Sequence, residues 1–391
     1  MIRILIMLSA LLLCASTNAE PLDAQAKDRG RAVVDRAVEF LRTSQGDTGG
    51  WSHNPQGPNF PAISGLVVNA MLLDPRIDST DSSVKQGLDY ILSFAKDDGS
   101  IHDNMLPTYN TAICVSTLSR ARTNQADSAL ASGISFLRTV QYHNDNTGGI
   151  EAPSFNEPVD EDHPYFGGVG YGRHGRPDMS NMSFFLQAMH DAEVSTEDPA
   201  FKRALVFLSR VQMNDDTNDM PYADSSSQGG FIYATVPNAE SIDGRAGQSM
   251  AGTIVETNTD GGSITRLRCY GSMTYAGFKS LVYADLSPDD PRIIAAWDWI
   301  ESNYSLDENP GMGDQGYYYF LCVMAKALDA YGVDEIGGVG GRDWRVDLVD
   351  TLEALQLDDG SFAVKHERWM ENNPDLITAF ALTALQYAIN E

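Results

Sequence analysis

The chain has 391 residues, with 27 Lys and Arg against 54 Asp and Glu, so its formal net charge is −27. Such an acidic chain is repelled by nucleic acid and by anionic membranes, which argues against both as partners. The length is sufficient for a large hydrophobic core in one or two domains, so the repeat pattern has to decide between them.

Residues 1–19 have the pattern of a secretory signal peptide. Arg3 precedes an apolar run, residues 4–13, that is too short to span a membrane, and Ala19 ends a small-residue stretch suited to cleavage before Glu20. No later stretch approaches the roughly 20 apolar residues of a membrane helix. We therefore expect a cleaved and soluble export, secreted or periplasmic.

From residue 20 onward, a unit of two helices recurs six times. In the first unit Val34, Ala37, Val38 and Leu41 share one helix face, a Gly-Gly loop with Trp51 follows, and the apolar stretch "PAISGLVVNAMLL" comes next. Later first helices appear in "VKQGLDYILSFAKDDGSI", "GISFLRTVQYHNDNTGGI", "ALVFLSRVQ", "RIIAAWDWIESNY" and "LVDTLEALQLDDGSF", each followed by a second apolar helix. Asp-Pro pairs at 198–199 and 290–291 predict the starts of two outer helices.

Six helix pairs without strand-like alternation predict an all-α protein. An open solenoid needs polar end caps, yet the last helix is strongly apolar, with one face formed by Ile377, Phe380, Ala381, Ala384, Leu385 and Ala388. A closed ring removes this problem because the last unit packs on the first. The sequence therefore predicts one (α/α)6 toroid over residues 20–391, with six inner and six outer helices and long rim loops over 142–177 and 213–270.

A glutamine followed by glycine and a large apolar residue marks the repeat, most clearly in residues 45–51, 141–150, 212–231 and 356–362. This pattern resembles the QW-type prenyltransferase/squalene oxidase repeats of the terpenoid cyclase and protein prenyltransferase superfamily. The resemblance covers the whole mature chain, which is similar to the second half of a squalene–hopene cyclase. In this role the glutamine amide ties the end of an outer helix to the next loop, and the aromatic side chain fills the gap between units.

The stretch "YFGGVGYGRHGRPDMSN", residues 165–181, resembles the catalytic Pro-Asp-x-Asp-Asp stretch of such cyclases. Asp178 aligns with the first aspartate, Ser180 with the middle one, which is the acid in the family, and Asn181 with the third. A serine hydroxyl cannot protonate a double bond. We therefore expect acid-initiated cyclase activity to be lost, with Asp178 either a remaining catalytic candidate or a helix cap.

The prenyltransferase branch implies a zinc site that this sequence does not complete. "RLRCYGSMTYAG" keeps Cys269 but has Leu267 in place of an aspartate, and tyrosines 317–319 stand where a histidine belongs. One ligand of three is too few for zinc, so no metal and no cofactor is expected and Cys269 is interpreted as a half-buried free thiol. With Cys114 and Cys322 the mature chain has three cysteines, which indicates no disulfide framework.

The starts of the inner helices are expected to converge on one mouth of the ring, where backbone N–H groups point inward. The candidates there are Tyr109, Asn110, Asp178, Ser180, Asn181, Ser272, Tyr275, Tyr317, Tyr318 and Asp375. A glycine-rich loop adds Asp162, His163, Tyr165, Tyr171 and His174. Asp375, like Asp178, can instead be a helix cap.

Several functions remain open at this stage, and so does the question of catalysis. The favoured hypothesis is a toroid that binds a small ligand in its mouth, apolar or glycan. The alternatives are an enzyme acting on an isoprenoid, a glycosidase or polysaccharide lyase that pairs Asp162 with Asp178, and a lipid- or peptide-binding module. Calcium at 144–149 or 214–219 is a further possibility, although solvated turns fit these stretches better. A deep aromatic pocket with one acid indicates the terpenoid type, and an open groove with two carboxyls about 5–10 Å apart indicates a glycan site.

Overall fold

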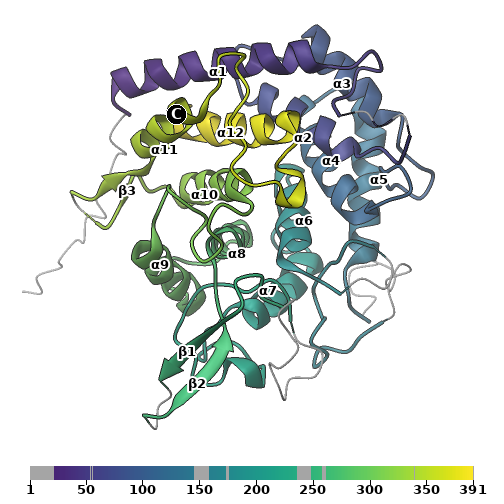
Figure 1. Ribbon diagram of the computed structural model, residues 1–391. Coiled ribbons are helices and arrows are strands. Elements are labelled where there is room, and N and C mark those ends of the chain that lie inside the picture. Colours follow the sequence, from purple (N-terminus) through teal and green to yellow (C-terminus); the bar gives the residue numbers. More distant parts are fainter. Residues whose placement is uncertain are drawn as a thin grey trace, which may run out of the picture.

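The structure is a computed structural model that describes residues 22–52, 54, 56–144, 158–172, 176–235, 248–257, 261–338 and 340–390. Within these residues, twelve α-helices form two concentric rings (Figure 1). The inner ring consists of α2 (Pro61–Leu72), α4 (Pro107–Ala121), α6 (Met179–Asp191), α8 (Gly271–Tyr283), α10 (Tyr317–Tyr331) and α12 (Pro374–Ile389). The outer ring consists of α1 (Ala24–Ser44), α3 (Ser82–Leu92), α5 (Asn124–Val140), α7 (Pro199–Val211), α9 (Pro291–Asn303) and α11 (Trp344–Leu355).

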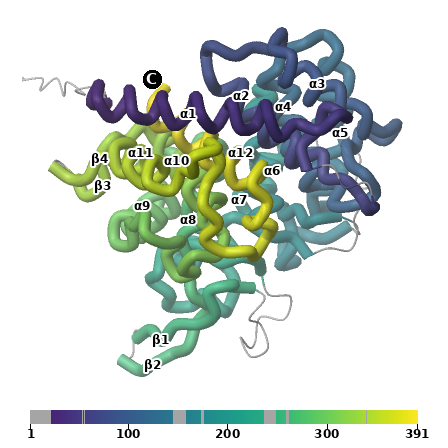
Figure 2. Tube along the Cα trace, turned by 45° about the horizontal axis from the view of Figure 1, so that its top comes forward, coloured from purple at the N-terminus to yellow at the C-terminus, as the bar shows by residue number. Residues whose placement is uncertain are grey.

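The inner ring closes on itself. Each inner helix packs against the next, and α12 returns to pack against α2, while α1 lies against α11 and α12. Figure 2 shows the two ends of the chain side by side, with the purple α1 running along the yellow α12. The predicted single α/α toroid is confirmed.

The burial of the helices follows from their place in the two rings. Inner helices such as α12 are buried on nearly every side, as expected for helices that are apolar all round. Outer helices are amphipathic, and on α1 the predicted face is at most 4% exposed. Asp198 and Asp290 cap α7 and α9 as predicted, since their carboxylates accept the amides of Ala200 and Arg292 at 2.9 Å. None of the helices in the described part of the chain has both the length and the apolar character needed to cross a bilayer.

The glutamine of the repeat joins three elements rather than the two that we predicted. Gln141 Nε2 donates to the carbonyl oxygens of Gly167 in the following loop and of Ala200 in the next outer helix, both at 2.9 Å. The same pair of bonds is made by Gln45, Gln212 and Gln356. For Gln356 the partner in the next outer helix is the carbonyl of Val33 on α1, so this bond helps to close the outer ring.

The loop glycines explain why the third copy was assigned incorrectly. Gln141 holds Gly167, and the residues around Ile150 that we had matched to it lie outside the described residues. Gly167 has a φ of 79°, as loop glycines of other copies do, and a Cβ there would lie 1.8 Å from the carbonyl oxygen of Arg203. An insertion therefore separates the glutamine from its loop in this copy, which the sequence pattern did not reveal.

Two small hairpins were not predicted. β1 (Thr253–Thr257) pairs with β2 (Ser263–Leu267), and β3 (Glu335–Ile336) pairs with β4 (Arg342–Asp343), both antiparallel. The first hairpin belongs to the rim loop 213–270 and projects away from the rings (Figure 2). Its strands "TIVET" and "SITRL" are rich in β-branched residues, and the sequence between them contains Asp-Gly-Gly, a combination typical of a hairpin. Two short 3-10 helices, η2 (Pro221–Ala223) and η3 (Arg368–Met370), complete the described elements.

Candidate functional site

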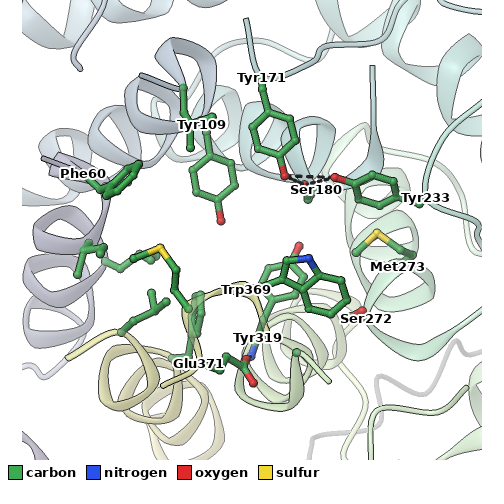
Figure 3. Close-up of a pocket in the computed structure, with 18 of the residues that line it drawn as sticks. Phe60, Tyr109, Tyr171, Ser180, Tyr233, Ser272, Met273, Tyr319, Trp369 and Glu371 are labelled. Carbon is green, nitrogen blue, oxygen red and sulfur yellow. Dashed lines mark hydrogen bonds between the residues drawn. The ribbon is translucent and has the colours of Figure 1, made fainter. Parts of the chain in front are cut away.

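A cavity of about 220 Å³ lies where the inner helices begin. All six contribute a residue close to their N-terminal ends, namely Ile63, Tyr109, Ser180, Ser272, Tyr319 and Leu376. The rim loops add side chains from above, including Tyr171 and Tyr233 (Figure 3). The cavity is therefore built by segments that are far apart in the sequence.

The wall of the cavity is aromatic and nearly uncharged. Eight of its 19 residues are aromatic: Phe60, Tyr109, Tyr171, Tyr233, Tyr270, Tyr319, Trp369 and Phe380. Glu371 is the one acidic residue among the lining residues, and the described residues contribute no Lys, Arg or His to the lining. Such a wall favours an apolar ligand with few polar groups and offers no cation to neutralise a phosphate.

One side of the cavity carries a hydroxyl cluster made of Tyr171, Ser180 and Tyr233. The phenol oxygens of Tyr171 and Tyr233 lie 3.2 Å apart, and the Tyr171 oxygen lies 3.2 Å from Ser180 Oγ (Figure 3). Ser180 Oγ also donates to Asp178 Oδ1 at 2.7 Å. The cluster offers hydroxyl groups to the cavity, with Ser180 between the cavity and Asp178.

Asp178 is the N-cap of α6 and does not line the cavity. It is 1% exposed, and its carboxylate accepts the amide N of Asn181 at 3.0 Å and Nδ2 of the same residue at 2.9 Å. Burial raises the pKa of Asp178, against hydrogen bonds that favour the charged form. The cap alternative accounts for these contacts, and the neighbouring Ser180 lines the cavity in place of Asp178.

Glu371 is the acidic group that the sequence analysis missed. It lies before α12 and is 1% exposed, and its Oε1 accepts the amide of Tyr319 in the first turn of α10 at 2.9 Å. The N-cap of α10 is Gly316, which has no side chain, so Glu371 caps this helix from a distant loop. Its Oε2 has no hydrogen-bond partner, and burial raises the pKa of Glu371 to about 7.

The tyrosines of α10 point in three different directions. Tyr317 and Tyr318, which we had named as candidates, donate their hydroxyls to the carbonyl oxygens of Leu306 and Ala363 and do not line the cavity. The following Tyr319 lines the cavity instead. Successive helical residues are rotated by about 100°, so only one of the three can face the ring axis.

Three further candidates have structural contacts outside the cavity lining. Asn110 Oδ1 accepts the amide of Ala62 at 3.0 Å and so links α4 to α2. Asp375 accepts a hydrogen bond from Ser52 at 2.7 Å, and the cap of α12 is Asn373, so the proposed capping role of Asp375 was wrong. The buried Tyr275 contacts Phe320 edge-on.

The glycine-rich loop supplies Tyr171 to the cavity but not the expected acid pair. Asp162 is exposed and Asp178 is sealed below Ser180, so these two carboxyls do not face one another across the cavity. His163 accepts the amide of Tyr165 through Nδ1, and burial lowers its pKa. Neither His163 nor Tyr165 lines the cavity, and His174 lies outside the described residues.

Cys269 and residues 214–219, which were considered as possible metal ligands, have other contacts in the structure. Cys269 is 2% exposed, more buried than we expected, and this burial raises its thiol pKa well above the usual value. The described residues contain no group of three or more His, Cys, Asp or Glu that could hold a metal. In residues 214–219, Asp215 accepts the amide of Ser225, and Asp219 forms an ion pair with Arg210 at 2.7 Å, as in a folded turn. Of residues 144–149, only Asn144 is described.

Solved structures with the same architecture are enzymes of two different classes. The chain is similar to the type II terpene cyclase MstE from Scytonema, with a TM-score of 0.55 and 12% identity over 94% of this chain and 99% of that chain. A related structure of MstE contains geranylgeranyl dihydroxybenzoate as substrate, at a TM-score of 0.52 and 11% identity over 93% and 99%. It is also similar to the GH76A α-1,6-mannanase from Salegentibacter sp. HEL1_6, with a TM-score of 0.57 and 8% identity over 93% and 99%.

The chain has a terpenoid-cyclase-like α/α-toroid fold. Its sequence matches no protein-family model and no curated protein. Identities of 8–12% show a common fold and leave the chemistry to be argued from the cavity itself.

Proposed function

We propose that this protein binds a mainly apolar ligand of isoprenoid type in the central cavity. The observation that carries the proposal is the cavity wall, with its eight aromatic side chains and a single carboxylic acid. Aromatic walls bury apolar chains and rings over large areas, and one acid is the arrangement expected of a terpenoid-type pocket. A substrate of this kind is bound by MstE, which shares the fold.

We also propose that the cavity does not initiate cyclisation by the family's acid. Both carboxylate oxygens of Asp178 accept hydrogen bonds from Ser180 and Asn181, and Asp178 is not among the residues that line the cavity. Asp178 therefore cannot donate a proton directly to a ligand in the cavity. Ser180 presents a hydroxyl there, which is far too weak an acid for protonating an alkene. Binding without acid-initiated cyclisation is what this arrangement supports.

The glycosidase alternative has the support of the mannanase fold but not of the cavity. Glycoside hydrolysis uses two carboxyl groups that flank the scissile bond. The described lining contributes Glu371 alone. Hydrolysis of α-1,6-linked mannotriose by purified protein would therefore contradict the proposal.

Export remains part of the proposal. The basic residue, short apolar run and small residues of positions 1–19 support cleavage before Glu20. Mass spectrometry of protein recovered from the secreted or periplasmic fraction should give an N-terminus at Glu20, and an intact Met1 on exported protein would contradict cleavage.

The binding proposal is tested by filling the cavity. Met273 lines it and is 3% exposed, whereas Ile294 on α9 is 48% exposed and distant from the lining. Met273→Trp should weaken the binding of farnesol, measured by calorimetry, at least tenfold, because the larger ring occupies the space of the ligand. Ile294→Trp is the matched control and should bind like the wild type.

Two results would contradict the functional proposal. One is farnesol binding that is equal in Met273→Trp and wild type, since the ligand then occupies another place. The other is a cyclised product from squalene or geranylgeraniol that Asp178→Asn abolishes.

A further inference from the structure

Glu371 and Tyr319 add two further polar groups to the cavity wall. Figure 3 shows these two side chains next to one another, across the cavity from Tyr171 and Ser180. They are tied together through the bond from the Tyr319 amide to Glu371 Oε1 at 2.9 Å. Glu371 Oε2 and the Tyr319 hydroxyl are both buried, and neither has a hydrogen-bond partner in the described part of the chain.

Two unsatisfied polar atoms in one wall are costly. A buried donor or acceptor without a partner destabilises the folded state, so native proteins rarely keep two of them in one cavity wall. Capping α10 accounts for Oε1 of Glu371 but leaves Oε2 and the Tyr319 hydroxyl unexplained. A ligand with a polar group in the cavity would offer Glu371 Oε2 a partner.

The segment beside Glu371 is strained as well. Trp369 and Met370 line the cavity, and both have positive φ values, 57° and 66°, which non-glycine residues rarely adopt. They are 46% and 42% exposed, so they lie at the mouth while Glu371 behind them is covered. Strained backbone of this kind is typical of ligand-binding segments.

The polar and charged groups around Glu371 determine which kind of ligand atom it can bind. It faces the first-turn amides of α10 and the phenol of Tyr318. On its own segment, Arg368 stacks over Trp369 and bonds Gln315. Asp375 on α12 is bound by Ser52. The α10 amides favour the ionised carboxylate, but desolvation is the larger effect, so the pKa of Glu371 rises to about 7.

We propose that Glu371 forms a hydrogen-bonding subsite for a neutral oxygen atom of the ligand and acts as donor in its protonated form, while the Tyr319 hydroxyl offers a separate polar group in the same cavity. The ligand class is then an isoprenoid that carries a carbonyl, ether or hydroxyl oxygen and no phosphate. This inference rests on the proposed function, because it assumes that the apolar cavity is the binding site. Anionic head groups are disfavoured because the described lining residues include no cationic side chain.

The test compares three probes of the same chain length: farnesal, which has a carbonyl acceptor, β-farnesene, which has no polar atom, and N,N-dimethylfarnesylamine, which is cationic. Calorimetry measures the affinity of each at pH 5.5 and pH 8.5. The wild type should prefer farnesal to farnesene at pH 5.5 by roughly 2- to 10-fold, the worth of one hydrogen bond. The preference should decrease at pH 8.5, because ionised Glu371 no longer donates.

Variants connect the pH dependence to this carboxyl. Glu371→Gln keeps a donor that does not titrate, so it should prefer farnesal equally at both pH values. Tyr319→Phe should reduce the preference for farnesal over farnesene at both pH values. The matched control is Glu367→Gln, which alters an exposed carboxyl of the same loop and should leave the pH profile of the wild type unchanged. Circular dichroism establishes that each variant is folded.

Four outcomes would overturn the inference. A wild-type preference for farnesal that does not change with pH excludes Glu371 as the titrating donor. Binding of the cationic amine that is tighter than that of farnesal already at pH 5.5 shows that Glu371 is an ionised counter-charge there rather than a protonated donor. If neither farnesal nor farnesene binds at any pH, the proposed function fails together with the subsite, whereas equal binding of the two leaves the proposed function standing and removes the subsite alone.

Discussion

The repeat glutamines Gln141 and Gln45 are expected to contribute unequally to the free energy of unfolding, because they are buried to different extents. Gln141 is fully buried, and it donates to the carbonyl oxygens of Gly167 and Ala200 and accepts from Arg203 Nε, each at 2.9 Å. The unbranched Gln141→Met has a similar volume and removes all three bonds. Each buried partner that loses its bond costs about 1–3 kcal/mol, so we expect the free energy of unfolding to fall by about 3–6 kcal/mol after some relaxation.

Gln45 provides the comparison within the same protein. It makes the equivalent two bonds, to the carbonyl oxygens of Gly49 at 2.7 Å and Ser83 at 2.9 Å, but it is only half-buried. Water can replace the lost amide there, so Gln45→Met should cost about 1–2 kcal/mol. Urea unfolding followed by far-ultraviolet circular dichroism measures both variants. A loss for Gln141→Met that is equal to or smaller than the loss for Gln45→Met would refute the reasoning.

Three further predictions concern the ring and its core. Trp51→Ala should lower the free energy of unfolding by about 3–5 kcal/mol, because the ring is 1% exposed and fills the space between units; an effect under 1 kcal/mol in urea unfolding would contradict this role. Gly167→Ala should prevent stable folding, since its Cβ would meet the Arg203 carbonyl at 1.8 Å, whereas Gly252→Ala, with a φ of 74° and open space around it, should cost only about 1 kcal/mol; thermal unfolding compares them, and equal melting temperatures would be inconsistent with the clash. Burial lowers the pKa of Lys279 to about 7 from the 10.5 of a free lysine, so the unfolded state binds the proton more tightly and stability should rise between pH 7 and pH 9 by about 2 kcal/mol. Lys279→Met should abolish this rise, and an unchanged pH slope in the variant would show that another group causes it.

Much of the fold could be predicted because its signals are local. The apolar faces of the outer helices, the Asp-Pro starts at Asp198 and Asp290, and the glutamine at the end of an outer helix all lie within one repeat unit. Ring closure followed from the apolar character of the last helix, which needs a partner. The β1–β2 hairpin was missed because its two five-residue strands show no clear period of two, so only their β-branched residues indicate a strand.

The site was predictable only in outline. A motif resemblance drew attention to Ser180, and Ser180 does line the cavity. Glu371 belongs to no motif, because its importance comes from covering the start of α10, more than fifty residues earlier in the chain. Burial by those distant elements, rather than the residues around it, raises its pKa.

The sequence by itself determined that helix pairs repeat, that the ring must close, and that Ser180 and Asn181 follow Asp178 at the start of an apolar helix. Only the tertiary structure decided that Tyr319, rather than Tyr317 or Tyr318, faces the cavity, that Gln141 binds Gly167 across an insertion, and that Glu371 is the acid in the wall. The physical reason is that periodicity reports which face of a helix is buried. A cavity, in contrast, is formed where six separate helix starts and two rim loops meet, and the desolvation and unpaired atoms of its wall exist only after that assembly.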